Sequence, residues 1–183
     1  SNRKKVDDVK GLVHIYTGDG KGKTTASIGL GIRAYGRGFR VLLIQFMKGM
    51  GTGEVATINE LSPRFTLHRG KGIKKFTWQM NEEEFEKLKE DQRKVFEYTS
   101  EAVRSGKWDL IILDEIMGAI SSKVIPLEEV VELVKNKPDE LELVLTGRDA
   151  PQELIELADY VSEIKAVKHP MEKGIPARKG IEN

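Results

Sequence analysis

The chain has 183 residues, among them 30 lysines and arginines, 29 aspartates and glutamates and no cysteine, which gives a formal net charge of +1. The length suits one domain with a substantial core, the charge balance gives no argument for a nucleic-acid partner, and the lack of cysteine excludes disulfides and thiol nucleophiles. Since no apolar run approaches the roughly 20 residues that cross a bilayer and the first residues carry no signal-peptide pattern, we expect a cytoplasmic protein without a membrane partner.

Short apolar runs alternate with helical patterns along the whole chain. Strands are expected at residues 11–17, 40–46, 64–70, 109–115, 141–148 and 160–167. Helices are expected at residues 24–36, 54–61, 82–105, 126–138 and from about 151 onward. This alternation predicts an α/β fold with a mainly parallel sheet covered by helices on both faces, in one domain over residues 11–167. We expect residues 1–10 and the tail at 168–183 to be loosely held.

The longest helical signal lies in the middle of the chain. Asn81 can cap this helix, acidic residues fill its first turn, and Gly106 ends it. Its core-facing residues are expected to be Phe85, Leu88, Val95, Thr99 and Ala102.

A glycine-rich stretch, TGDGKGKTT, connects the first strand to the first helix. A phosphate loop reads Gly, four residues and Gly-Lys-Ser/Thr; Gly22, Lys23 and Thr24 fit its end, while Thr17 stands where the first glycine would be. Backbone N–H groups of such a loop form an anion nest, and the next helix points its positive end at the same anion. We therefore expect a nucleotide, with Thr24 on Mg²⁺, rather than a glycine-rich turn with surface lysines. The expected nucleotide-binding residues here are Thr17, Gly18, Asp19, Gly20, Lys21, Gly22, Lys23, Thr24 and Thr25.

Two further strands end in charged residues. The run LIILDE ends in Asp114 and Glu115, and LTGRD places Arg148 after another buried strand. The carboxyl ends of parallel strands share the sheet edge where ligands bind, so we expect an acid for the metal and a guanidinium for phosphate oxygens. The alternatives are solvated acids at a strand end and a surface arginine. Arg33 lies on the helix after the loop, and the sequence does not decide between a nucleotide contact and a solvent-facing or packing role.

The stretch KKFTWQM places two large aromatic residues, Phe76 and Trp78, just before the cap of the longest helix. The residues alone favour a hydrophobic staple or a contact with a satellite of the core. The histidines at 14, 68 and 169 are scattered, and the first two lie within expected strands, which favours core or edge positions over ligand roles.

Taken together, these residues resemble the P-loop corrinoid adenosyltransferases, which are ATP:cob(I)alamin or cob(I)yrinic acid a,c-diamide adenosyltransferases. The resemblance rests on GDGKGKTT after HIYT, QFMKG after the second strand, FTW, LDE, LTGR and VKHPMEKGIPARKGIEN at the end, and it covers nearly the whole chain from about residue 11. The family commonly has threonine at the position of Thr17, whereas its usual asparagine is Asp19 here. No histidine has the spacing of the familiar corrinoid-binding histidine motif.

The resemblance implies a single-domain, RecA-like P-loop NTPase fold and an enzyme that works on ATP and a corrinoid. The Co(I) centre would attack the 5′ carbon of ATP and release inorganic triphosphate, in the synthesis or salvage of adenosylcobalamin. Lys23 and Arg148 would neutralise the triphosphate together with Mg²⁺ or Mn²⁺. Thr24 would hold the metal together with one of the two acids. Glu115 is favoured over Asp114 as the closer ligand, although the sequence does not decide between them.

The resemblance also implies how the corrinoid is held. Phe76 and Trp78 would fill the face of the cobalt that its lower axial ligand vacates, which makes Co(II) easier to reduce. The tail at 168–183 would fold over the corrinoid site. A homodimer and a reduced flavoprotein as electron donor are implied as partners.

Two other functions fit parts of the sequence. A P-loop kinase or NTP hydrolase would release ADP, and Asp114 with Glu115 would suit a positioned water. A nucleotide switch or RecA-like nucleic-acid binder would need a basic face; its best support is RGKGIKK at residues 69–75, against a nearly neutral net charge.

Overall fold

The computed structural model of the protein describes residues 10–183, which form helices around a single sheet. The expected flexible segment at residues 1–10 therefore lies outside the described residues, except for Lys10. The sheet has the order β3-β2-β4-β5-β1-β6, and every neighbouring pair is parallel. The strands are β1 (Val13–Thr17), β2 (Val41–Gln45), β3 (Phe65–Arg69), β4 (Leu110–Asp114), β5 (Glu142–Thr146) and β6 (Tyr160–Glu163).

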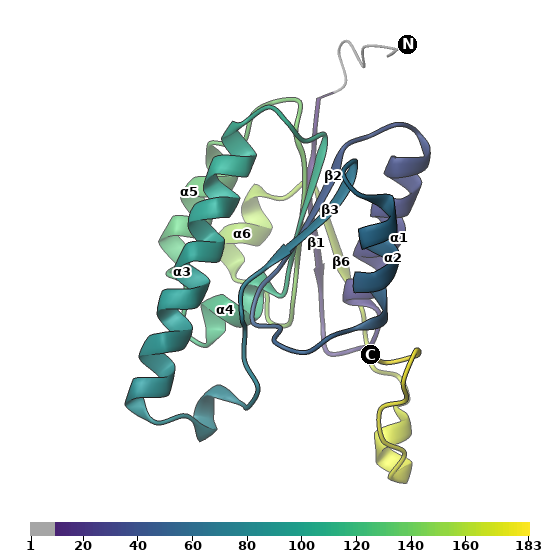
Figure 1. Ribbon diagram of the computed structural model, residues 1–183, viewed down its shortest axis with the longest axis vertical. Helices are drawn as coiled ribbons and strands as arrows, with labels where there is room; N and C mark the ends of the chain where they lie inside the picture. Colours follow the sequence, from purple (N-terminus) through teal and green to yellow (C-terminus); the bar gives the residue numbers. More distant parts are fainter. Residues whose placement is uncertain (1–9) are drawn as a thin grey trace.

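Helices cover both faces of this sheet, as Figure 1 shows. One face carries α1 (Lys23–Gly36) and α2 (Gly53–Leu61). The other carries α3 (Glu82–Arg104), α4 (Ile116–Ser121), α5 (Leu127–Lys135) and α6 (Gln152–Leu157). The predicted α/β fold of a P-loop NTPase is confirmed; the strands are shorter than predicted, whereas α1 and α2 each begin one residue earlier than predicted. The helix α4 and the short 3₁₀ helices η1 (Thr77–Gln79) and η2 (Pro170–Lys173) were not predicted. None of the described helices combines the length and the apolar character needed to cross a bilayer.

Close packing on both faces explains the apolar runs of the central strands. All residues of β2 and β4 are buried, because helices cover the sheet on either side. On α1 the buried residues are the small Ser27 and Gly31. A Cβ on Gly31 would lie 2.8 Å from the ring of Phe65, so this helix needs a small residue to approach the sheet.

The longest helix, α3, begins as predicted. The Asn81 side chain accepts a hydrogen bond from the Glu84 N–H, and the Glu84 side chain returns to the Asn81 backbone, which forms a capping box. Four of the five predicted core-facing residues are buried, and Phe85 is half-buried against the same core. The helix ends at Arg104, two residues before Gly106.

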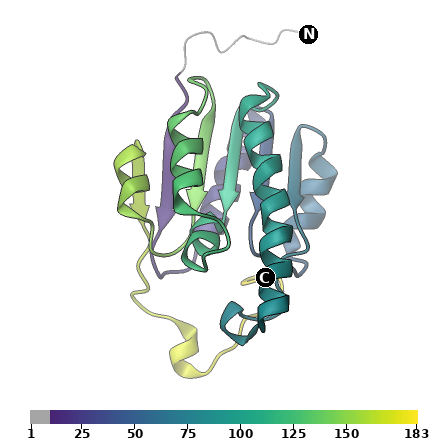
Figure 2. The same ribbon diagram turned by 90° about the vertical axis from the view of Figure 1, so that its left-hand side faces the viewer.

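The topology creates a crevice beside β1. On one face α1 carries the chain from β1 to β2, and on the other α6 carries it from β5 to β6. Because β1 and β5 are neighbours, the chain leaves them in opposite directions, and ligands bind at such points. Figure 2 shows the carboxyl ends of the strands at the bottom of the view, on the side of the tail.

Glu142, at the start of β5, forms hydrogen bonds with residues at the start of β1. The Glu142 carboxylate accepts a hydrogen bond from the Leu12 N–H at 2.8 Å and lies 2.8 Å from Nε2 of His14. Burial raises the pKa of Glu142, but the contacts with His14 and Leu12 and the nearby Lys137 ammonium outweigh burial, so the pKa is lowered overall.

We expect Glu142→Gln to lower the free energy of unfolding by about 1 kcal/mol at pH 7. Because the folded-state pKa of Glu142 lies below the unfolded value of about 4.3, the carboxylate stabilises the fold above that pH. Its contribution is lost as the pH falls through the folded-state pKa. Urea unfolding of both proteins at neutral and acidic pH checks this, since the gap between them should narrow in acid; a gap that stays constant contradicts the assignment.

Candidate nucleotide-binding site

A cavity of about 460 Å³ opens at the carboxyl edge of the sheet, beside the loop between β1 and α1. Gly22, with a φ of 123°, is the residue before α1, so the positive end of this helix faces the cavity. The lining includes residues 19–25 of the loop, Glu115 after β4, Arg148 and Asp149 after β5, and His169, Ile181 and Glu182 of the tail. The structure thus brings the loop, one predicted acid and the predicted arginine together.

The glycines of the loop are needed for packing as well as for the turn. Gly18 has a φ of 109°, and a Cβ there would lie 2.2 Å from the carbonyl oxygen of Ile164. The Gly20 N–H donates to the same oxygen at 2.9 Å, and the Asp19 carboxylate accepts from the Ala166 N–H at 3.2 Å. At the base of the loop, the Thr17 hydroxyl accepts from the Ala150 N–H at 3.2 Å.

Three cationic side chains line the cavity, Lys21, Lys23 and Arg148, and the last two repel each other. The Lys23 ammonium donates to the carbonyl oxygen of Gly20 at 2.8 Å, which folds the side chain back over the loop. Burial lowers the pKa of Lys23, and the charge of Arg148 lowers it further, while Glu115 raises it. A polyanion bound here would relieve the repulsion between the two cations, and its presence would favour the charged form of Lys23.

Asp114 is fully buried at the end of β4 and is surrounded by donors. Its Oδ1 accepts hydrogen bonds from the hydroxyls of Thr24 and Thr146, both at 2.8 Å. Its Oδ2 forms an ion pair of 2.7 Å with Nζ of Lys48. The Thr146 hydroxyl in turn accepts from the Glu115 N–H at 3.0 Å, so this network also fixes the backbone of the neighbouring acid.

Glu115 is placed differently from Asp114. It is half-buried, has a φ of 62° and faces the cavity. Burial and the charge of Asp114 raise the pKa of Glu115, against the lowering effect of nearby cations. Among the described residues, nothing makes a hydrogen bond or ion pair with its carboxylate.

The donors in the cavity fit Mg²⁺. The Thr24 hydroxyl gives its proton to Asp114 and keeps its lone pairs, and Glu115 adds a carboxylate, so both are hard oxygen ligands. No cluster of three or more His, Cys, Asp or Glu side chains that could hold a metal occurs within residues 10–183. A site with so few protein ligands is typical of Mg²⁺ that a nucleotide also holds through its phosphates.

Comparison with known proteins agrees with this geometry. The family model of the ATP:corrinoid adenosyltransferase BtuR/CobO/CobP matches residues 9–183. The chain belongs to this family. It is 34% identical over 175 residues to a corrinoid adenosyltransferase of Escherichia coli K12, which covers 96% of this chain and 87% of that protein. It is 37% identical over 181 residues to one of Sinorhizobium sp (96% and 81% covered) and 32% identical over 173 residues to corrinoid adenosyltransferase CobA of Salmonella typhimurium LT2 (94% and 86%).

As a member of the corrinoid adenosyltransferase family, the chain is a transferase.

The two aromatic residues before α3 lie at the surface. The rings of Phe76 and Trp78 stack with centroids 5.5 Å apart and planes 10° apart. The two side chains are 63% and 77% exposed and belong to neither core cluster. The interpretation as a staple or core contact, which the residues alone favoured, is therefore wrong.

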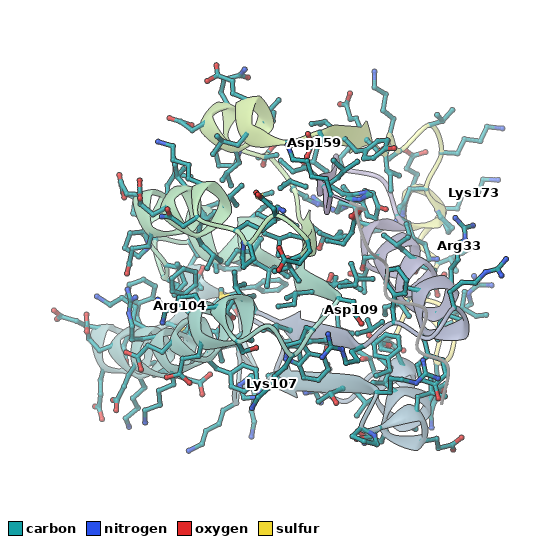
Figure 3. All side chains as sticks on the ribbon, turned by 90° about the horizontal axis from the view of Figure 1, so that it is seen from above. Arg33, Arg104, Lys107, Asp109, Asp159 and Lys173 are labelled. Atoms are coloured by element: carbon teal, nitrogen blue, oxygen red, sulfur yellow. The ribbon has the colours of Figure 1, made fainter. Side chains whose placement is uncertain are left out.

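Arg33 lies outside the cavity, whereas residues of the C-terminal tail line it. Arg33 is exposed near the end of α1, on the side away from the sheet in Figure 3, and it does not line the cavity. His169, Ile181 and Glu182 of the tail line the cavity beside the loop. The expected role of the tail over the corrinoid stays a prediction, and the contact that the structure shows is with this cavity.

The basic stretch at residues 69–75 has a structural role. The carboxylate of Asp91 accepts hydrogen bonds from the N–H groups of Lys71 and Gly72, both at 3.0 Å. A Cβ on Gly72 would lie 2.0 Å from the carbonyl oxygen of Lys48. The glycines here allow two loops to pack tightly, which accounts for them without a nucleic acid.

Sequence reasoning missed Thr146 and Lys48, although both belong to quoted motifs. The signal available was a polar residue at the end of a buried strand, as in LVLT before Gly147. Which acid each residue contacts depends on the order of the strands, which the sequence does not state.

Replacement of Thr146 by valine tests this network. Thr146→Val keeps the shape but removes the donor to Asp114 and the acceptor for the Glu115 N–H, both at a buried position. We expect the free energy of unfolding to fall by about 1–3 kcal/mol in urea unfolding. Thr66→Val, on the edge strand β3, is the control and should change it by less than about 0.5 kcal/mol. Equal values for the two variants would contradict the assignment.

Proposed function

We propose that the chain transfers the 5′-deoxyadenosyl group of ATP to the Co(I) centre of a corrinoid, either cobalamin or cobyrinic acid a,c-diamide, and releases inorganic triphosphate. Such a reaction belongs to the synthesis or salvage of adenosylcobalamin. One observation carries the proposal: in a chain of this family, a phosphate-type loop, three cationic side chains and an unpaired carboxylate line one cavity.

The chemistry needs no general base. The electron pair of Co(I) forms the cobalt–carbon bond as the bond between the 5′ carbon and oxygen breaks, and that pair leaves on the triphosphate. Cobalt is formally oxidised to Co(III), and no proton moves. The barrier then lies in the alignment of cobalt with carbon and in the charge on the leaving group.

The residues of the cavity address the charge on the leaving group. Lys23, Arg148 and the backbone N–H groups of the loop would bind the triphosphate, and each such contact supplies on the order of 2–4 kcal/mol in comparable electrostatic sites. Thr24 and Glu115 would hold Mg²⁺ or Mn²⁺. The metal would add positive charge next to the leaving oxygens.

The aromatic pair supports a role with the corrinoid. Large apolar side chains that are stacked and exposed are available to cover a flat ligand face. Phe76 and Trp78 would take the lower face of the corrinoid and favour a four-coordinate Co(II). A homodimer and a reduced flavoprotein as electron donor complete the proposal, on the resemblance alone.

An anaerobic assay tests the reaction. The protein is mixed with ATP, Mg²⁺ and cob(I)alamin made with a strong reductant, and the loss of Co(I) absorbance is followed together with the phosphate product. Light-sensitive adenosylcobalamin and triphosphate should form in equal amounts. Formation of ADP with an unchanged corrinoid would contradict the proposal and favour a P-loop kinase or hydrolase.

A further inference from the structure

A buried carboxylate at the back of the nucleotide cavity depends on one cation. Asp114 has no exposed surface, and an ionised acid in such a place needs a partner charge. Within residues 10–183, Lys48 is its only ion-pair partner, with Nζ 2.7 Å from Oδ2. The amide nitrogen of Gln45 lies 3.4 Å from the same oxygen and is neutral, so it cannot supply this charge.

The two oxygens of Asp114 have separate partners. Oδ2 is taken by Lys48, and Oδ1 accepts the protons of the Thr24 and Thr146 hydroxyls. A metal ion at Oδ2 would have to compete with the Lys48 ammonium group and the Gln45 amide, which both donate to this oxygen. The Thr24 hydroxyl is oriented by this arrangement, because its proton points to Asp114 and its lone pairs point elsewhere.

The backbone around Lys48 is fixed by a second loop. Lys48 forms a parallel bridge with Ile73, and the Ile73 N–H donates to the carbonyl oxygen of Met47 at 3.2 Å. Met47 has a φ of 66°, and its N–H donates to the side chain of the buried Gln92 at 2.9 Å. These contacts hold the backbone at Lys48 from the loop of Ile73 and from α3, and the ion pair with Asp114 places the ammonium group in the structure without a ligand.

We propose that Lys48 is a positioning residue of the nucleotide site: its ammonium group pairs with Oδ2 of Asp114 and so fixes Oδ1 as the acceptor for the Thr24 hydroxyl, so that Thr24, and not Asp114, contacts the metal of a bound metal–nucleotide. The inference rests on the proposed function only in that a nucleotide binds at the loop. Lys48 acts through Asp114 and touches neither the nucleotide nor the metal.

The test uses ATP and Mn²⁺ without a corrinoid, on the full chain. ATP affinity is measured by calorimetry with Mn²⁺ and with a chelator, and bound Mn²⁺ is measured by paramagnetic resonance. Lys48→Met should weaken ATP binding about tenfold or more with Mn²⁺, a loss of about 1.4 kcal/mol, and less than threefold with the chelator. Lys48→Arg should restore most of the loss, and Lys71→Met, an exposed lysine of the adjoining loop, should match the wild type.

Several results would overturn the inference. Equal losses with and without Mn²⁺ would show a general structural role, and unchanged affinity would show no role. If Lys48→Met does not fold, the single variant Asp114→Asn is compared with the double variant Asp114→Asn/Lys48→Met. Asp114→Asn removes the buried carboxylate, so the loss of Lys48 then leaves no buried charge without a partner. In that background the loss of Lys48 should change the Mn²⁺-dependent affinity less than twofold; a further large loss would mean that Lys48 contacts the nucleotide itself. A wild type that binds no ATP would instead overturn the proposed function.

Discussion

Lys23→Ala should lower the rate of adenosyl transfer by about a hundredfold or more while the protein stays folded. The lysine lines the cavity beside Arg148, and loss of one preorganised charge at a developing anion costs about 3–4 kcal/mol in comparable sites. Its one hydrogen bond goes to the carbonyl of Gly20 within the loop, so thermal unfolding should hardly change. The decay of Co(I) absorbance at saturating ATP measures the rate.

A matched lysine serves as the control. Lys107 is exposed just before β4, at the opposite edge of the sheet, and is labelled in Figure 3. Lys107→Ala should keep the wild-type rate. Turnover of Lys23→Ala close to that of the control would remove the loop lysine from the chemistry and would leave the triphosphate assignment without its main support.

Phe76→Ala and Trp78→Ala should slow the reaction that starts from Co(II) much more than the reaction that starts from Co(I). If the stacked rings replace the lower axial ligand, their loss should slow the reaction that starts from Co(II) and a reductase by about tenfold or more, equivalent to about 1.4 kcal/mol. The reaction of chemically prepared Co(I) skips the reduction and should fall by less than about threefold. Both side chains are exposed, so stability should be unchanged.

The two assays form an internal control for this pair. Phe76→Tyr keeps an aromatic ring and should behave like the wild type in both. Equal losses in the Co(I) and Co(II) assays would assign the rings to corrinoid binding in general and would rule out the role in reduction.

The sequence was most informative where the chemistry is local. Residues 19–25 follow one another along the chain, so their spacing alone predicted a loop that the structure places beside a helix terminus. Asp114 and Arg148 were placed at the same edge because strands of a parallel sheet end together. The cap at Asn81 was visible for the same reason, since a capping box spans only four residues.

Features that depend on the strand order stayed hidden. The ion pair between Lys48 and Asp114 joins residues 66 positions apart, and neither motif indicates that the two residues are in contact. The exposure of Phe76 and Trp78 was also out of reach, since apolar side chains near a helix cap are usually buried, and only the resemblance pointed to a ligand. The short helix α4, with six residues, is too brief to show a helical period.

The contact between the loop and Ile164 separates two parts of the C-terminal segment. Residues up to Ala166 support the phosphate loop from behind, through the hydrogen bonds of Ile164 to Gly20 and of Ala166 to Asp19. Further along the chain, His169, Ile181 and Glu182 line the same cavity. A deletion that starts at Ile164 would remove both hydrogen bonds to the loop, whereas one that starts after Ala166 would keep them and would remove only the tail residues that line the cavity.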